Sequence, residues 1–209
     1  MDKETPRLIV GISGATGSIL GVRLLETLKT LNVETHLVLS KWGIHTLLQE
    51  TTFTLEQVHK MATRHYAPHD QGAAISSGSF LTRGMVVCPC SVRSLAAIAG
   101  GNGDNLLHRA ADVVLKESRK LVLVVREAPL SAVHLENMLK LARMGVVIFP
   151  PVPAFYTHPQ TIDDIVDQTV MRVLDQFDIH LPSGKRWTGG MSVNGESAAE
   201  AQQTRRRKK

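Results

Sequence analysis

The 209-residue chain has 43% hydrophobic and 21% charged residues, a composition that indicates a globular protein and excludes a disordered one. Its formal net charge of +5 comes from its last five residues, Arg205 to Lys209, so the rest of the chain is formally neutral. No apolar stretch approaches the roughly 18 to 20 residues needed to cross a bilayer, and "MDKETPR" lacks the layout of a secretory signal. These features predict a cytoplasmic protein that binds neither membranes nor nucleic acid.

Strand-like and helix-like segments alternate along the chain. Strands are predicted over Arg7–Ile12, Glu34–Leu39, Met85–Cys88, Leu121–Val125 and Val146–Phe149. Helices are predicted over Ser18–Leu31, Trp42–Glu50, Leu55–Ala62, a segment that begins near Ser91, Leu106–Lys116, Ala132–Met144 and Thr161–Phe177. Short apolar strands separated by helices indicate a single α/β domain, in which a doubly wound parallel sheet lies between two helical layers.

Two segments lie outside this pattern. The closing stretch "GGMSVNGESAAEAQQTRRRKK" lacks periodicity and aromatic residues, so residues 1–188 are predicted to form the domain and residues 189–209 a disordered basic tail. The loop from His65 to Thr82 is long for a compact domain, and long ordered loops are more often functional.

The two cysteines, Cys88 and Cys90, flank Pro89 on an apolar run that the proline is expected to end. They are poorly placed to bond to each other, so they are interpreted as small buried thiols. The nine histidines are scattered and show no spacing typical of metal ligands. No metal site is predicted.

The first strand runs into a glycine-rich turn, "GISGATGS". Such a turn places backbone N–H groups and a helix N-terminus against an anion. Enzymes that use NAD place a carboxylate after the second strand, whereas Ser40 and Lys41 follow it here. This favours a ligand with one phosphate and leaves open an NADP-dependent reductase that uses Lys41. A turn that merely packs glycine against a helix is the structural alternative.

A second polar loop, "CPCSVRSLAAIAGG", follows the third predicted strand. Its hydroxyl groups at Ser91 and Ser94 lie where the next helix begins, so they would cap that helix, contact a ligand, or do both. Two such loops at neighbouring strand ends predict a ligand crevice at one edge of the sheet.

With these two loops and further segments in the same order, the sequence resembles the UbiX family of flavin prenyltransferases, formerly described as aromatic-acid decarboxylases. The resemblance covers nearly all of residues 8–187. It is carried, in order, by "GISGATGS", "SKW", "CPCSVRSLAAIA", "DNLLHRAADVVLKESRKLVLVVREAPLSAVHLENM", "PPVPAFYTHPQTIDDIVD" and "RW". The tail lies outside it.

The resemblance implies a flavodoxin-like (Rossmann-like) fold, FMN binding without a metal, and a homododecamer. It also implies transfer of the dimethylallyl group of dimethylallyl phosphate to N5 and C6 of reduced FMN. The product, prenylated FMN, would serve a UbiD-type decarboxylase.

The resemblance also implies a set of site residues. The flavin contacts would be Gly14, Ala15, Thr16, Ser40, Ser91, Val92, Arg93, Ser94 and Arg126. The prenyl-phosphate side would use Lys116, Glu127, Tyr156 and Arg172, with Arg109 and Glu50 nearby and Trp187 as a lid. Thr16 stands where many family members have serine, and it keeps the hydroxyl group.

These roles agree with the chemistry of an allylic phosphate. Arg126, Arg172 and Lys116 would stabilise the departing phosphate, to which Tyr156 would donate a hydrogen bond. An aromatic surface at Trp187 would shield the allylic cation. The carboxylates of Glu50 and Glu127 would accept or relay protons.

Each of these residues also has a structural interpretation. Arg172 would form a surface salt bridge, Arg126 and Glu127 would form an ion pair at a strand end, and Lys116 would lie at a solvated helix end. Glu50 would be an ordinary charge at a helix end. Tyr156 would pack within a loop, and Trp187 would pack in the core or in an interface.

Two further functional alternatives remain besides the NADP-dependent reductase. A cysteine-type oxidative decarboxylase would share the serine-rich loop, and a non-catalytic flavin carrier would keep both loops without a cationic phosphate pocket.

Overall fold

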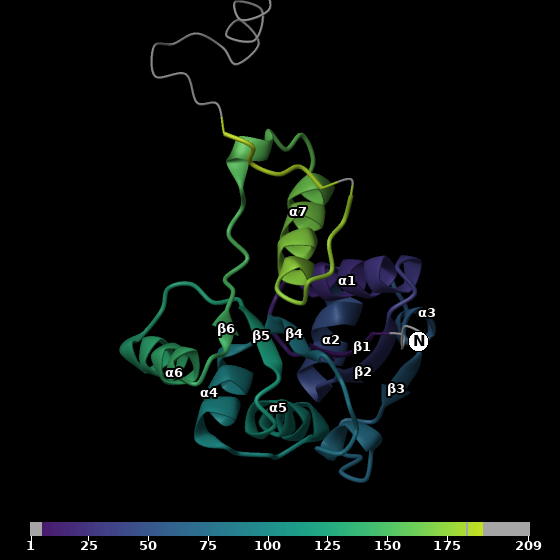
Figure 1. Ribbon diagram of the computed structural model, residues 1–209, viewed down its shortest axis with the longest axis vertical. Helices are drawn as coiled ribbons and strands as arrows, with labels where there is room; N and C mark the ends of the chain where they lie inside the picture. The colour runs from purple at the N-terminus through teal and green to yellow at the C-terminus, as the bar shows by residue number, and fades with distance from the viewer. Residues whose placement is uncertain (1–5, 183, 190–209) are drawn as a thin grey trace, which may run out of the picture.

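The computed structural model describes residues 6–182 and 184–189, which form a six-stranded parallel sheet covered by helices (Figure 1). The strands are β1 Arg7–Ile12, β2 Glu34–Leu39, β3 Arg64–Tyr66, β4 Gly84–Cys90, β5 Lys120–Val125 and β6 Val147–Ile148, in the order β3-β2-β1-β4-β5-β6. Without the short edge strand β3, the other five follow the flavodoxin order 2-1-3-4-5. The predicted fold class is confirmed.

Two layers of helices cover the sheet. The helices are α1 Ser18–Thr30, α2 Lys41–Glu50, α3 Leu55–Met61, α4 Val92–Gly100, α5 Leu106–Lys116, α6 Ala132–Arg143 and α7 Ile162–Asp175, with 3-10 turns η1 Ala74–Ser76 and η2 Phe155–Thr157. One hydrophobic cluster joins α1, α2, α3 and α7 to one face, and a second joins α4, α5 and α6 to the other. No helix of the described residues is long and apolar enough to cross a membrane.

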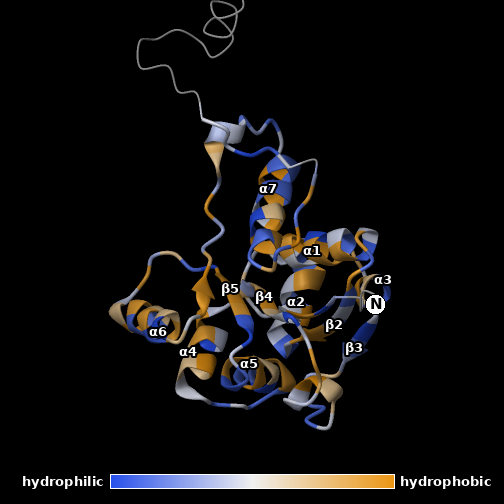
Figure 2. Ribbon diagram, viewed as in Figure 1, coloured by the Kyte–Doolittle hydropathy of each residue, from blue (hydrophilic) through white to orange (hydrophobic). Residues whose placement is uncertain are grey.

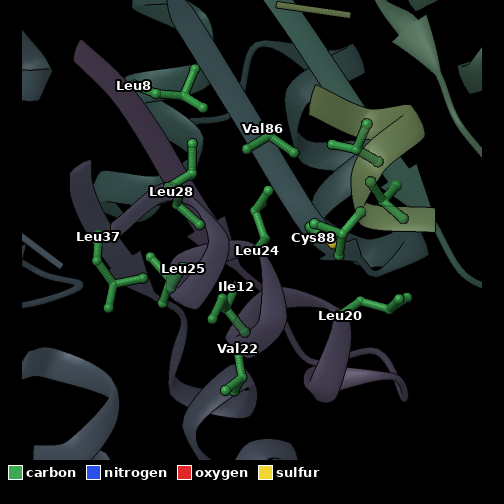
Figure 3. Packing of buried hydrophobic residues seen from close by; sticks show 14 of the residues in the cluster. Leu8, Ile12, Leu20, Val22, Leu24, Leu25, Leu28, Leu37, Val86 and Cys88 are labelled. Carbon is green, nitrogen blue, oxygen red and sulfur yellow. The ribbon is translucent and has the colours of Figure 1, made fainter. Parts of the chain in front are cut away.

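The alternation of strand side chains explains this division. In β1, Leu8, Val10 and Ile12 belong to the first cluster, whereas Ile9 belongs to the second. Figure 3 shows the first cluster, in which leucines of α1 such as Leu24 pack beside these strand residues. Both faces of the sheet are therefore buried, and the strands read as continuous apolar runs.

The fourth strand departs from its predicted end. β4 continues through Pro89 to Cys90, so the expectation that the proline stops the strand at Cys88 is wrong. Its pairing with β5 is irregular between Val87 and Cys90, and this irregularity accommodates a residue that has no N–H for the ladder. Both thiols are buried and free, as predicted, and burial raises the pKa of Cys90 to about 12.

The long segment from His65 to Thr82 has a structural role in this chain. Arg119 donates hydrogen bonds to the carbonyl oxygens of Gly78 at 2.6 Å and Phe80 at 2.8 Å, and Ile75 of η1 is buried in the second cluster. The sequence did not predict β3 or either 3-10 turn, because each has only three residues and no periodic apolar pattern. The predicted tail lies outside the described residues, apart from Gly189.

Candidate functional site: a polar crevice at the carboxyl edge of the sheet

A cavity of about 580 Å³ opens where β1, β2, β4 and β5 end and the loops after them meet. It is lined by Gly14, Ala15, Thr16, Ser40, Lys41, Trp42, Ser91, Val92, Arg93, Ser94, Asp104, Asn105, His108, Arg126 and Glu127. We call it the crevice. It contains all nine residues predicted to contact flavin, together with Glu127. Parallel strands bring their carboxyl ends to one edge, and for this reason segments far apart in sequence meet here.

Three helices begin at the crevice, and each is capped by a side chain that lines it. Ser40 caps α2, Ser91 caps α4 and Asn105 caps α5, accepting hydrogen bonds from Gly43 N, Ser94 N and His108 N respectively. The positive ends of three helix dipoles therefore converge on one cavity, which favours an anionic ligand. The predicted capping role of Ser91 is confirmed.

Charged side chains add to the electrostatic potential that the helix dipoles create in the crevice. Lys41, Arg93 and Arg126 line the crevice with positive charge, against the carboxylates of Asp104 and Glu127. No ion pair joins Arg126 to Glu127 among the described residues, so the simple ion-pair interpretation of these two does not describe them. Glu127 instead accepts a hydrogen bond from Ala128 N at 3.1 Å.

Close approach of two backbones requires glycine at position 14. A Cβ atom built on Gly14 would lie 2.4 Å from Cβ of Trp42, a contact that real structures do not tolerate. The glycine thus lets the first loop pack against the start of α2 while both segments line the crevice.

Glu50 lies at the end of α2 and binds backbone N–H groups at the start of α1. Its Oε2 accepts hydrogen bonds from Gly17 N at 2.8 Å and Ser18 N at 3.0 Å. Burial alone would raise the pKa of Glu50, but hydrogen bonds from Thr16, Ser18 and Gly17 outweigh burial and lower that pKa. The carboxylate therefore occupies the α1 N-terminus and leaves the N-termini of α2, α4 and α5 for a ligand.

Three predicted residues lie at a second cavity, of about 540 Å³, beyond the end of β6. Tyr156, Arg172 and Trp187 line it, together with Arg186 and Gln168. The rings of Tyr156 and Trp187 meet edge-on with centroids 5.7 Å apart, and the Tyr156 hydroxyl lies 3.3 Å from Nε2 of Gln168. This cavity, which we call the aromatic cavity, combines a phenol, two guanidinium groups and an indole.

Asp175 binds two of the arginines that line the aromatic cavity. Its carboxylate accepts hydrogen bonds from Arg186 at 2.7 and 2.8 Å, from Arg172 at 3.0 Å and from His180 at 2.8 Å. The hydrogen bond with Arg186 is the largest cause that lowers the pKa of Asp175, to about 2. Arg172 thus forms the predicted salt bridge and still lines the cavity.

Arg109 and Lys116 line neither cavity in this chain. Arg109 pairs with Asp112 at 2.8 Å, and Lys116 pairs with Glu117 at the last turn of α5. His108 in the first turn of α5 also lines the crevice, and the eight residues from it to Lys116 span about 12 Å of helix. Lys116 is therefore roughly that far from the crevice, at the solvated helix end that the structural interpretation describes.

Sequence reasoning missed several lining residues. Asp104, Asn105 and His108 lie in the quoted segment that begins "DNLLH", but none of them was assigned a site role, although Asn105 before an apolar helix is an N-cap signal. Trp42 lies in the quoted segment "SKW" but was assigned no role, and Asp175 carried no signal of its own.

The chain is similar to known flavoproteins along most of its length. Residues 1–174 match the Flavoprotein family. A probable UbiX-like flavin prenyltransferase of Bacillus subtilis is 58% identical over 183 residues, which cover 88% of this chain and 90% of the relative. The crystal structure of AnUbiX (PadA1) in complex with FMN and dimethylallyl pyrophosphate has a TM-score of 0.88 and 50% identity, and covers 89% of this chain and 99% of that one.

A third relative bears on assembly. A dodecameric FMN-dependent UbiX-like decarboxylase from Escherichia coli O157:H7 has a TM-score of 0.86 and 58% identity, and covers 88% of this chain and all of that one. Within the residues that the structure describes, no group of three or more His, Cys, Asp or Glu side chains is arranged to hold a metal. On identity and coverage alike, this chain belongs to the UbiX family of flavin prenyltransferases.

Proposed function

We propose that this protein is a flavin prenyltransferase, which joins the dimethylallyl group of dimethylallyl phosphate to N5 and C6 of reduced FMN. The observation that carries the proposal is the crevice, where every residue expected to contact flavin comes together in one cavity. Its relatives are named for this activity, and one of them was solved with FMN and a dimethylallyl donor.

The crevice suits FMN in charge, size and shape. Its three capped helix N-termini and three cationic side chains match a phosphate group. Its volume of about 580 Å³ falls within the range of ligand pockets. The close packing of Gly14 against Trp42 holds the first loop and the start of α2 together in the wall of the crevice.

When bound and reduced, FMN would supply the nucleophilic ring positions that accept the prenyl group. The chain's own residues would bind the flavin phosphate, exclude water and neutralise the phosphate that leaves the donor. Arg172 and Arg186 provide the positive charge for the leaving phosphate, and the Tyr156 hydroxyl provides a hydrogen-bond donor. Trp187 beside Tyr156 provides an aromatic surface for the allylic cation.

The crevice and the aromatic cavity share no lining residue, and Lys116 reaches neither. We therefore infer that the donor site is completed between copies of the chain in a homo-oligomer, a dodecamer as in the Escherichia coli relative. In such an assembly Lys116 and Arg109, on the exposed side of α5, would meet a neighbour's cavity. The product would be consumed by a UbiD-type decarboxylase in the cytoplasm.

The test is anaerobic. The protein is mixed with reduced FMN and dimethylallyl phosphate, and in a parallel arm with dimethylallyl pyrophosphate, and the released flavin is weighed by mass spectrometry. A gain of one C5H8 unit supports prenyl transfer, and the arm that shows it identifies the donor. Unmodified flavin in both arms, with FMN shown to be bound, would contradict the proposal and favour the flavin carrier.

A further inference from the structure

His108 is a buried imidazole in the wall of the crevice. It lies in the first turn of α5, is only 5% exposed, and lines the cavity beside Ser94 of α4. Its Nε2 is 3.2 Å from Oγ of Ser94, and its Nδ1 has no hydrogen-bond partner among the residues described. Neither the family resemblance nor the proposed mechanism gives this histidine a role.

The hydrogen bonds around Ser94 assign its hydroxyl proton. Oγ of Ser91 accepts a hydrogen bond from Ser94 N at 3.2 Å and donates its own proton to Oγ of Ser94 at 3.3 Å. Ser94 Oγ therefore already accepts one hydrogen bond, from Ser91. A hydroxyl has two acceptor positions and one proton to donate.

The tautomer of His108 follows from its burial. Burial is the main cause that lowers the pKa of His108, so the ring is neutral at neutral pH and carries one N–H. A proton on Nδ1 would leave a buried N–H without an acceptor, which is the rarer and costlier arrangement. A proton on Nε2 instead donates to Ser94 and leaves only a lone pair unpaired.

With both acceptor positions of Ser94 Oγ filled by Ser91 and His108, its own proton remains to be donated, and Ser94 lines the crevice. We propose that His108 positions the Ser94 hydroxyl as a hydrogen-bond donor to an acceptor oxygen of FMN, on its phosphate or on a ring carbonyl. The proposal rests on the proposed function only in that FMN is the ligand. His108 is a positioning residue, since it acts through Ser94.

The experiment measures dissociation constants by flavin fluorescence for the wild type, His108→Leu, His108→Gln, Ser94→Ala and the double variant His108→Leu with Ser94→Ala. His108→Leu is expected to weaken FMN binding about fivefold, the value of one hydrogen bond. His108→Gln is expected to restore most of it, because its side-chain amide N–H reaches toward Ser94. In the Ser94→Ala background, His108→Leu is expected to have no further effect.

Riboflavin, which lacks the phosphate, identifies the acceptor. A loss confined to FMN assigns the phosphate, and an equal loss with riboflavin assigns a ring carbonyl, and either result supports the proposal. His108→Asn, whose amide is too short to reach Ser94, is expected to behave like His108→Leu and serves if leucine prevents folding.

Two results would overturn the proposal: an effect of His108→Leu that persists unchanged without the Ser94 hydroxyl, or no rescue by glutamine. Because binding and not turnover is measured, its failure is separable from that of the proposed function. A protein that binds FMN with this coupling but does not prenylate it contradicts the function alone.

Discussion

At the residue scale, the wall of the crevice requires that Gly14 has no Cβ atom. Gly14→Ala places a Cβ 2.4 Å from Trp42, so the first loop or the start of α2 must shift. We expect a loss of about 1 to 3 kcal/mol in the free energy of unfolding and weaker FMN binding, measured by denaturant titration and flavin fluorescence. Gly72→Ala is the matched control, since its nearest contact would be an ordinary 3.5 Å. Equal behaviour of the two variants would contradict this account of the loop.

Glu50 offers a second prediction at this scale. Glu50→Gln removes the charge at the α1 N-terminus, and we expect the free energy of unfolding to fall by about 0.5 to 1 kcal/mol at low salt. Denaturant titration at neutral pH measures it. Glu136→Gln, at an exposed position in the middle of α6, should change nothing. A stability equal to the wild type would show that the carboxylate does not stabilise the helix start.

At the scale of elements, Asp175 ties the segment after α7 to the helix itself. Asp175→Asn removes the negative charge that Arg172, His180 and Arg186 share. We expect faster hydrogen exchange in residues 184–189 and a changed Trp187 fluorescence. Asp178→Asn is the control, because Asp178 has a left-handed backbone that asparagine also adopts and forms no ion pair among the described residues. Unchanged exchange in Asp175→Asn would show that other contacts hold the segment.

The same carboxylate predicts a pH dependence. The pKa of Asp175 is lowered from 3.8 to about 2 in the folded protein, chiefly by Arg186. A lowered folded pKa means that the ionised group contributes stability above the unfolded value, and that this contribution is lost as the pH falls from 3.8 toward 2. Thermal unfolding across that window should therefore show a steeper loss of Tm in the wild type than in Asp175→Asn. Parallel curves would contradict the assignment.

At the scale of the whole molecule, α6 lies at one edge of the fold (Figure 1), and Figure 2 shows apolar residues along it. Leu135 and Leu139, four residues apart and each 51% exposed, lie on one face. In a monomer this face would be left in water, so we expect it to bury against another copy.

Replacing Leu135 and Leu139 together by glutamate is expected to dissociate the assembly, as measured by sedimentation velocity. FMN binding should survive, because one chain forms the crevice, whereas prenyl transfer should be lost if Lys116 acts on a neighbour's cavity. Lys140→Glu, an exposed charge reversal on the same helix, should leave the assembly intact. An unaltered sedimentation coefficient in the double variant would place the interface elsewhere.

The sequence by itself determined the layers of the fold and predicted the crevice. Apolar strand runs and helical periodicity predicted five of the six strands and all seven helices, because these signals are local. The two loops at the strand ends, "GISGATGS" and "CPCSVRSLAAIAGG", predicted a crevice, because parallel strands present their carboxyl ends at one edge.

Only the tertiary structure decided which groups face one another across that edge. His108 meets Ser94 because α4 and α5 pack side by side, and Arg186 meets Asp175 because the chain turns back along α7. Periodicity fixes which residues share a helix face, but a contact between elements depends on the packing of two buried surfaces, and no single stretch of sequence encodes that packing.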